Sequence, residues 1–151
     1  MKLAEALQAR TDLNTRLEQL RSRLQKNAVM QEGIAPAEDP EELLREAEAC
    51  LAELGSLMTR INLTNCATTV EGRSLTALLA ERDVLRMRLS LLRDTAEAAS
   101  DLTERYSQAE IRKLSALDVK KLRRQVDECA AAFRRLDNTI QAMNWQTELL
   151  N

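Results

Sequence analysis

The sequence predicts an all-α protein of about four long amphipathic helices, arranged as an antiparallel bundle or as coiled-coil hairpins. Ala, Leu, Glu, Lys and Arg make up 85 of the 151 residues, and only three Gly and two Pro interrupt them. This composition is typical of long helices when the apolar residues recur at helical spacing. They do recur at alternating intervals of three and four. A chain of this length fits one domain, so we expect a single helical domain over residues 1–151.

The first helix is predicted over about residues 2–30. Its apolar residues continue at intervals of four, three and four through Leu13, Leu17, Leu20 and Leu24. A connector containing Gly33 and Pro36 follows. The second helix is predicted over about residues 40–64, because Asp39 can cap it and Pro40 suits the first helical position.

The second helix has an unusually wide apolar stripe. A regular seam is expected from residues at intervals of three and four: Leu44, Ala47, Leu51, Leu54, Met58 and Ile61. Leu43, Cys50 and Leu57 widen it on one side. Three apolar positions in each seven predict a helix that contacts more than one neighbour.

The third helix is predicted over about residues 75–102, after a turn at Gly72. A break is expected near Tyr106, and the last helix is predicted over about residues 116–144. Ser115, followed three residues later by Asp118, resembles a capping box at its start.

Several classes of function are disfavoured by the composition. The chain has no histidine, which removes the commonest general base and metal ligand. We therefore expect no catalytic residues, no metal and no cofactor. A magnesium-dependent nucleotide hydrolase is the enzyme alternative, and its candidate carboxylates are Glu42, Glu46, Glu81 and Asp83. The net charge of −2 argues against a nucleic-acid partner.

Polar residues within the apolar stripes are the candidate site. Asn27, Asn65 and Arg82 fall at seam positions, where a buried polar group can fix helix register. The alternative is a small polar pocket at one end of the bundle, with arginines as anion donors. The residues assigned to this pocket or register role are Asn62, Asn65, Thr68, Thr69, Arg82 and Arg86.

Short phrases spread over most of the chain resemble a known family. They are Met1–Leu7, Glu32–Gly33, Pro36–Pro40, Ile61–Asn65, Ala80–Leu85, Arg105–Ser107 and Asn144–Trp145. Together they are similar to the bacterial septicolysin-like family. The resemblance implies a small helical protein without an assigned biochemical role, and the family label implies a membrane-active cytolysin.

The residues themselves favour a non-enzymatic protein that acts by self-association or by binding another protein. We expect a homo-oligomer with no integral membrane segment, since no apolar run approaches about 18 residues. Three cysteines far apart in sequence suit a reducing compartment, so a cytoplasmic location is expected. The cytolysin and the magnesium-dependent hydrolase are the alternatives.

Overall fold

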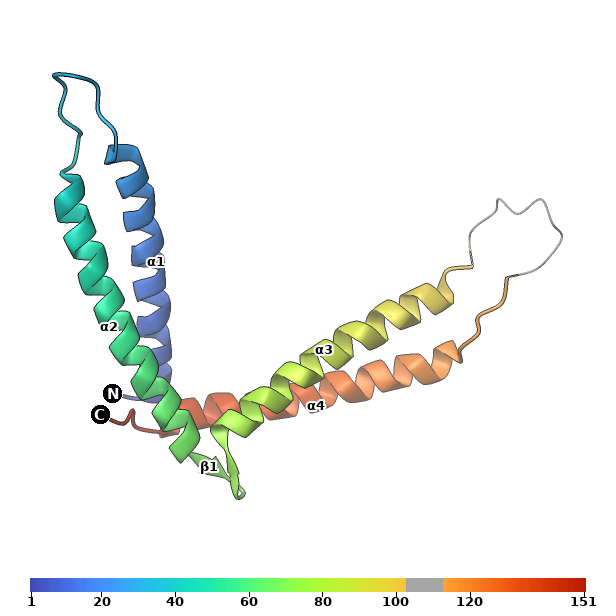
Figure 1. Ribbon diagram of the computed structural model, residues 1–151. Helices are drawn as coiled ribbons and strands as arrows, with labels where there is room; N and C mark the ends of the chain where they lie inside the picture. Colours follow the sequence, from blue (N-terminus) through green and yellow to red (C-terminus); the bar gives the residue numbers. More distant parts are fainter. Residues whose placement is uncertain (103–112) are drawn as a thin grey trace, which may run out of the picture. The chain divides into compact units, whose positions relative to one another are not determined.

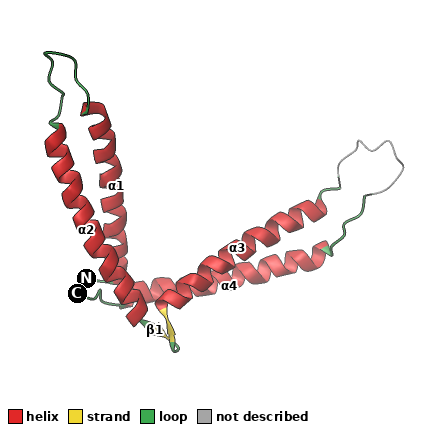
Figure 2. Ribbon diagram, viewed as in Figure 1, coloured by secondary structure: helices red, strands yellow, loops and turns green. Residues whose placement is uncertain are grey.

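The computed structural model describes residues 1–102 and 113–151, and it is all-α apart from one very small hairpin (Figures 1 and 2). The described elements are α1 (Leu3–Asn27), α2 (Pro40–Ala67), β1 (Thr69–Val70), β2 (Arg73–Ser74), α3 (Leu75–Ser100) and α4 (Val119–Gln146). The prediction of an all-α fold with about four long helices is confirmed. Every helix end lies within about three residues of its predicted position.

The chain divides into two compact units. The first consists of Met1–Ser74 together with Ala142–Asn151, and the second is Leu75–Gln141. The last turn of α4 therefore belongs to the first unit. The single helical domain predicted over residues 1–151 stays a prediction.

In the first unit, α1 and α2 form an antiparallel hairpin (Figure 1). Their contact is made by buried residues that recur every seven positions: Leu13, Leu20 and Asn27 on α1, and Leu43, Cys50, Leu57 and Thr64 on α2. The Cys50 thiol lies 3.7 Å from the carbonyl oxygen of Leu13. This regular packing follows from the heptad spacing of the two helices.

Asn27 ends α1 three residues before the predicted end at Met30. Its side-chain amide donates to the carbonyl of Arg23 at 2.9 Å, and its side-chain oxygen accepts from the Glu38 N–H at 3.0 Å. This buried asparagine joins the end of α1 to the residues just before α2. At the start of α2, Asp39 accepts from the Glu41 N–H at 2.9 Å, as the predicted cap requires.

The second helix continues to Ala67, beyond its predicted end at residue 64. Thr64 is buried, and its hydroxyl donates to the carbonyl of Arg60 at 2.7 Å. The Thr68 N–H donates to the carbonyl of Thr64 at 2.9 Å. These contacts hold the last turn, which extends beyond the predicted end of the helix.

The turn predicted at Gly72 is confirmed. β1 and β2 pair antiparallel, and the two residues between them have positive φ, 51° at Glu71 and 79° at Gly72. Two consecutive left-handed residues define a type I′ turn, which matches the twist of a short hairpin.

The two ends of the chain pair with each other, and the C-terminal end is bonded to the C-terminal half of α2, an arrangement that we call the terminal clasp (Figure 1). The clasp consists of Met1–Leu3 and Thr147–Leu150 with Arg60 and Thr64. The Leu3 N–H donates to the Thr147 carbonyl and the Leu149 N–H donates to the Met1 carbonyl, both at 2.9 Å. The Leu150 N–H donates to the Thr64 hydroxyl at 3.0 Å, while Arg60 donates to the Leu150 carbonyl at 2.8 Å.

In the second unit, α3 and α4 run antiparallel. Arg82 Nη1 lies 3.0 Å from Asp137 Oδ1, and the Cys129 thiol lies 3.6 Å from the Leu85 carbonyl oxygen. Arg82 is thus paired with Asp137, and Leu85, later on α3, is paired with Cys129, earlier on α4, as expected for antiparallel helices.

The start of α4 differs from the prediction. The cap is Asp118, whose side chain accepts from the Lys121 N–H at 3.0 Å, and the helix begins at Val119. Ser115 instead accepts from the Leu117 N–H at 3.3 Å in a local turn. An aspartate three residues after a serine fits either position, so spacing alone could not choose between them. The predicted break near Tyr106 lies outside the described residues.

Candidate functional site: an open apolar face on α2

α2 carries large apolar side chains on two sides. Leu43, Cys50 and Leu57 are buried against α1. Their immediate neighbours in sequence also recur every seven residues but are largely open to solvent: Leu44 is 52% exposed, Leu51 48% and Met58 44%. The sequence analysis assigned Leu44, Leu51 and Met58 to the main seam, and this was wrong. Both sets are apolar, so the width of the stripe indicated two contacts without showing which one α1 makes.

A groove of about 470 Å³ runs beside this exposed stripe. Its apolar lining comes from both helices: Leu17 and Leu24 of α1, and Ala47, Leu51 and Leu54 of α2. Polar side chains of α1 form its rim: Asn14, Glu18, Arg21 and Gln25. We call the groove lining together with Leu44 and Met58 the leucine face. A contiguous apolar surface rimmed by polar groups is typical of a protein interaction site.

The charges on the rim of the groove are mutually balanced. Glu18 Oε1 and Arg21 Nη1 lie 3.8 Å apart, and both side chains are about 70% exposed. The leucine face therefore has an electrically neutral border. Five of its lining side chains are aliphatic, which suits the groove to binding apolar surface.

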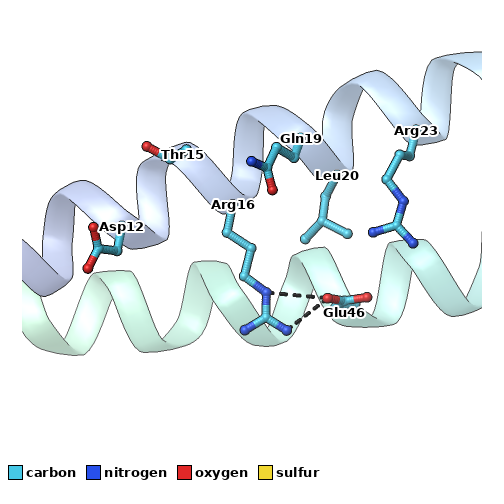
Figure 3. A pocket seen from close by; sticks show the side chains of 7 residues that line it. All are labelled: Asp12, Thr15, Arg16, Gln19, Leu20, Arg23 and Glu46. Atoms are coloured by element: carbon cyan, nitrogen blue, oxygen red, sulfur yellow. Dashed lines mark hydrogen bonds and ion pairs between the residues drawn. The ribbon is translucent and has the colours of Figure 1, made fainter.

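A second hollow on the same hairpin is polar (Figure 3). It measures about 400 Å³ and is lined by Asp12, Thr15, Arg16, Gln19, Leu20, Arg23 and Glu46. Arg16 donates to Glu46 at 2.8 Å, the contact drawn as dashed lines in Figure 3. Arg23 is bonded to Glu38 through both its Nε and its Nη2.

Both arginines of the polar hollow are paired with carboxylates. The hydrogen bond from Arg16 to Glu46 raises the pKa of Arg16. In the same way, the hydrogen bond with Glu38 raises the pKa of Arg23, and it lowers the pKa of Glu38. Because both guanidinium groups already have a carboxylate partner, the hollow is better explained as a stabilising border between α1 and α2 than as an anion site.

Four residues of the predicted polar site lie near the end of α2. Asn62 is exposed and Asn65 is half-buried, both within the helix. Thr68 is the C-terminal cap, and Thr69 pairs with Ser74 in the small sheet. The structure thus gathers these four around the last turns of α2 and the start of the hairpin.

The other two predicted residues, Arg82 and Arg86, lie on α3 and meet around Asp83. Arg82 Nε is 4.0 Å and Arg86 Nη1 3.5 Å from the Asp83 carboxylate. The Arg86 guanidinium also lies over the ring of Phe133, 5.7 Å from its centre. Since the arginines and the α2 residues belong to separate units, the pocket that would join all six stays a prediction.

The four candidate magnesium carboxylates are distributed over α2 and α3. Glu46 is paired with Arg16, and Asp83 lies close to two arginines. Within residues 1–102 and 113–151, no three His, Cys, Asp or Glu side chains are grouped so that they could hold a metal ion. None of the helices described there is both long enough and apolar enough to cross a membrane.

Fold and surface together define a class: an all-α protein whose helices pair antiparallel and whose first hairpin leaves one apolar face open. Within that class, the chain belongs to the family of unknown function DUF6847, whose model matches residues 10–149. It is also similar to a solved structure, described as the crystal structure of a functionally unknown conserved protein from Corynebacterium diphtheriae. The two sequences are 39% identical, the match covers 99% of each chain, and the TM-score is 0.93.

The resemblance to the septicolysin-like family is wrong. The family model assigns the chain to DUF6847, and neither that family nor the Corynebacterium diphtheriae structure is described as a cytolysin. The phrases on which the resemblance was based are short. Two of them, Met1–Leu7 and Ala80–Leu85, consist mainly of Ala, Glu, Arg and Leu, which recur in many unrelated helical proteins. A search of the curated proteins found no match.

Proposed function

We propose that this protein is not an enzyme and that it acts by protein association, in the first place with a second copy of itself, through the leucine face. The observation that carries the proposal is the exposed row of Leu44, Leu51 and Met58 at seven-residue spacing. A helix with one exposed and one buried heptad row has the pattern of a helix with two helical neighbours. Within the first unit, α1 packs on the buried row and leaves the other row exposed.

A second copy suits the leucine face better than a small molecule does. The groove is lined by aliphatic side chains of both helices, and its polar side chains are exposed residues of α1. Small-molecule sites usually combine an apolar pocket with a few inward-pointing polar groups. Helices that pack against such a groove need only apolar side chains at heptad spacing, and the leucine face itself provides these.

The proposal places the protein in a reducing compartment, the cytoplasm. Cys50, Cys66 and Cys129 are not joined by disulfides, and Cys66 is exposed. Thiols persist where glutathione and thioredoxin keep proteins reduced.

Size-exclusion chromatography with light scattering tests the association. The chain has a mass of 17.1 kDa, so we expect a particle of at least twice this mass at micromolar concentration. Leu51→Glu should return the protein to the monomer mass, because it buries an unpaired carboxylate in the interface. Leu63→Glu is the matched control, since Leu63 lies on the same helix, is 53% exposed and falls outside the leucine face.

The two variants separate association from folding. Both should keep the helical circular dichroism of the wild type, because each replaces an exposed side chain. A wild-type protein that is monomeric at micromolar concentration would rule out self-association. A Leu51→Glu variant that keeps the oligomer mass would rule out the leucine face as the contact between copies.

A further inference from the structure

We propose that two copies pair antiparallel, α2 against α2, about a twofold axis that passes beside Leu51. This inference rests on the proposed self-association and specifies its geometry. Leu44, Leu51 and Met58 are the exposed apolar residues of the α2 row, and Leu51 is its centre. A twofold axis at this point places Leu44 of one copy beside Met58 of the other and each Leu51 beside its equivalent.

The charges of α2 favour this direction. Its first half, residues 40–53, contains five glutamates and one arginine, whereas its second half, residues 54–67, contains Arg60 as its single charged residue. Antiparallel pairing sets each acidic half against the weakly basic half of the other copy. Parallel pairing would set the two acidic halves against each other, and like charges at close range oppose association.

The residues that flank the apolar row agree with the same axis. Glu48 and Gly55 are nearly equidistant from Leu51, as are Glu41 and Asn62, and all four are exposed. Antiparallel pairing therefore places Glu48 over Gly55 and Glu41 within reach of the Asn62 amide, which can donate to a carboxylate. No two glutamates of this flank meet.

Gly55 fits this arrangement, and no close contact among the described residues explains why a glycine stands there. It lies in the middle of α2, where glycine weakens a helix, and a Cβ added to it would meet nothing in the described chain within 4 Å. The first unit therefore does not require a glycine at this position. In the antiparallel pair, the missing side chain leaves room for the longer Glu48 side chain of the second copy.

Cysteine cross-linking tests the direction and the centre of the pairing. All chains carry Cys66→Ser, which removes the exposed thiol, while Cys50 and Cys129 are buried. A disulfide between copies requires Cα atoms within about 7 Å of each other. Under mild oxidation, Leu51→Cys should cross-link to its own equivalent, and co-expressed Leu44→Cys and Met58→Cys chains should cross-link to each other. Neither of the latter two should form a covalent dimer when expressed alone.

The outcomes separate this inference from the proposed function. A covalent dimer of Leu44→Cys alone would show parallel pairing, which overturns the inference and leaves self-association intact. A particle of dimer mass in which none of these positions cross-links would place the contact elsewhere on the leucine face, again overturning the geometry only. A monomeric wild-type protein would remove both.

Discussion

Arg82 on α3 is a charged side chain that is largely withdrawn from water. Its side chain is 19% exposed, and its Nη1 is paired with Asp137 at 3.0 Å. Its Nε is buried and has no hydrogen-bond partner within the described residues. The pair thus depends on one good hydrogen bond, and losing its acceptor would leave a guanidinium poorly solvated.

We expect Asp137→Ala to destabilise the protein more than Arg82→Leu does. Removing the carboxylate takes away the hydrogen-bond acceptor of the sequestered arginine and leaves only the more distant Asp83 carboxylate, 4.0 Å from its Nε. This should lower the free energy of unfolding by about 1–3 kcal/mol. Removing the arginine leaves Asp137, which is 33% exposed and can be hydrated, and adds apolar surface to the contact of α3 with α4. Urea unfolding followed by circular dichroism measures both values. Equal effects of the two substitutions would contradict this account of the pair.

At the scale of elements, the heptad spacing of Leu and Ala predicted all four described helices, because burying one apolar side is what stabilises a long helix. The helix ends were less well determined. Asn27 and Thr64 set two of them through contacts with Glu38 and Leu150, which are remote in sequence or lie across a connector. The spacing of apolar residues shows how wide the apolar stripe is, but not which part of it faces the neighbouring helix. It could therefore not show that Leu43, and not Leu44, is buried against α1.

The cap of α4 can be tested by a pair of alanine substitutions. Asp118→Ala should lower the free energy of unfolding by about 1 kcal/mol, because the Lys121 N–H loses its acceptor at the start of the helix. Ser115→Ala, four residues from the helix start, should change it by less than about 0.5 kcal/mol. Thermal or urea unfolding of the two variants gives the comparison. A larger effect at Ser115 would restore the capping box that the sequence suggested.

At the scale of the whole molecule, the terminal clasp is a feature that no local pattern predicted. It pairs residues 1–3 with residues 147–149, and strand-like pairing of such short segments has no periodic signal. Lys2 Nζ and the Met1 amino group lie 2.7 Å and 3.2 Å from the Glu148 carboxylate. Their hydrogen bonds lower the pKa of Glu148 below its ordinary value of 4.5.

This pKa shift predicts a loss of stability in acid. Glu148 and Glu38 both have a pKa lowered by cationic partners in the folded protein. Each therefore stabilises the fold fully above the ordinary value of 4.5, and this contribution is lost as the pH falls through the lowered folded value. The double variant Glu38→Gln, Glu148→Gln should lose less thermal stability than the wild type between pH 6 and about 3. If the melting temperatures of the two proteins fall equally with pH, these carboxylates do not contribute to the acid sensitivity of the fold.

Because α2 has one apolar row buried against α1 and another exposed, the proposed association links the folding of the hairpin to protein concentration. Ala47 and Leu54 help to line the groove, and Leu54 is also part of the core of the hairpin, so the surface offered to a second copy exists only once α1 and α2 have packed together. A binding partner that recognises only the native state shifts the unfolding equilibrium toward that state as its concentration rises. Under the proposed self-association, the melting temperature should depend on the protein concentration, and dilution alone should make the protein easier to unfold.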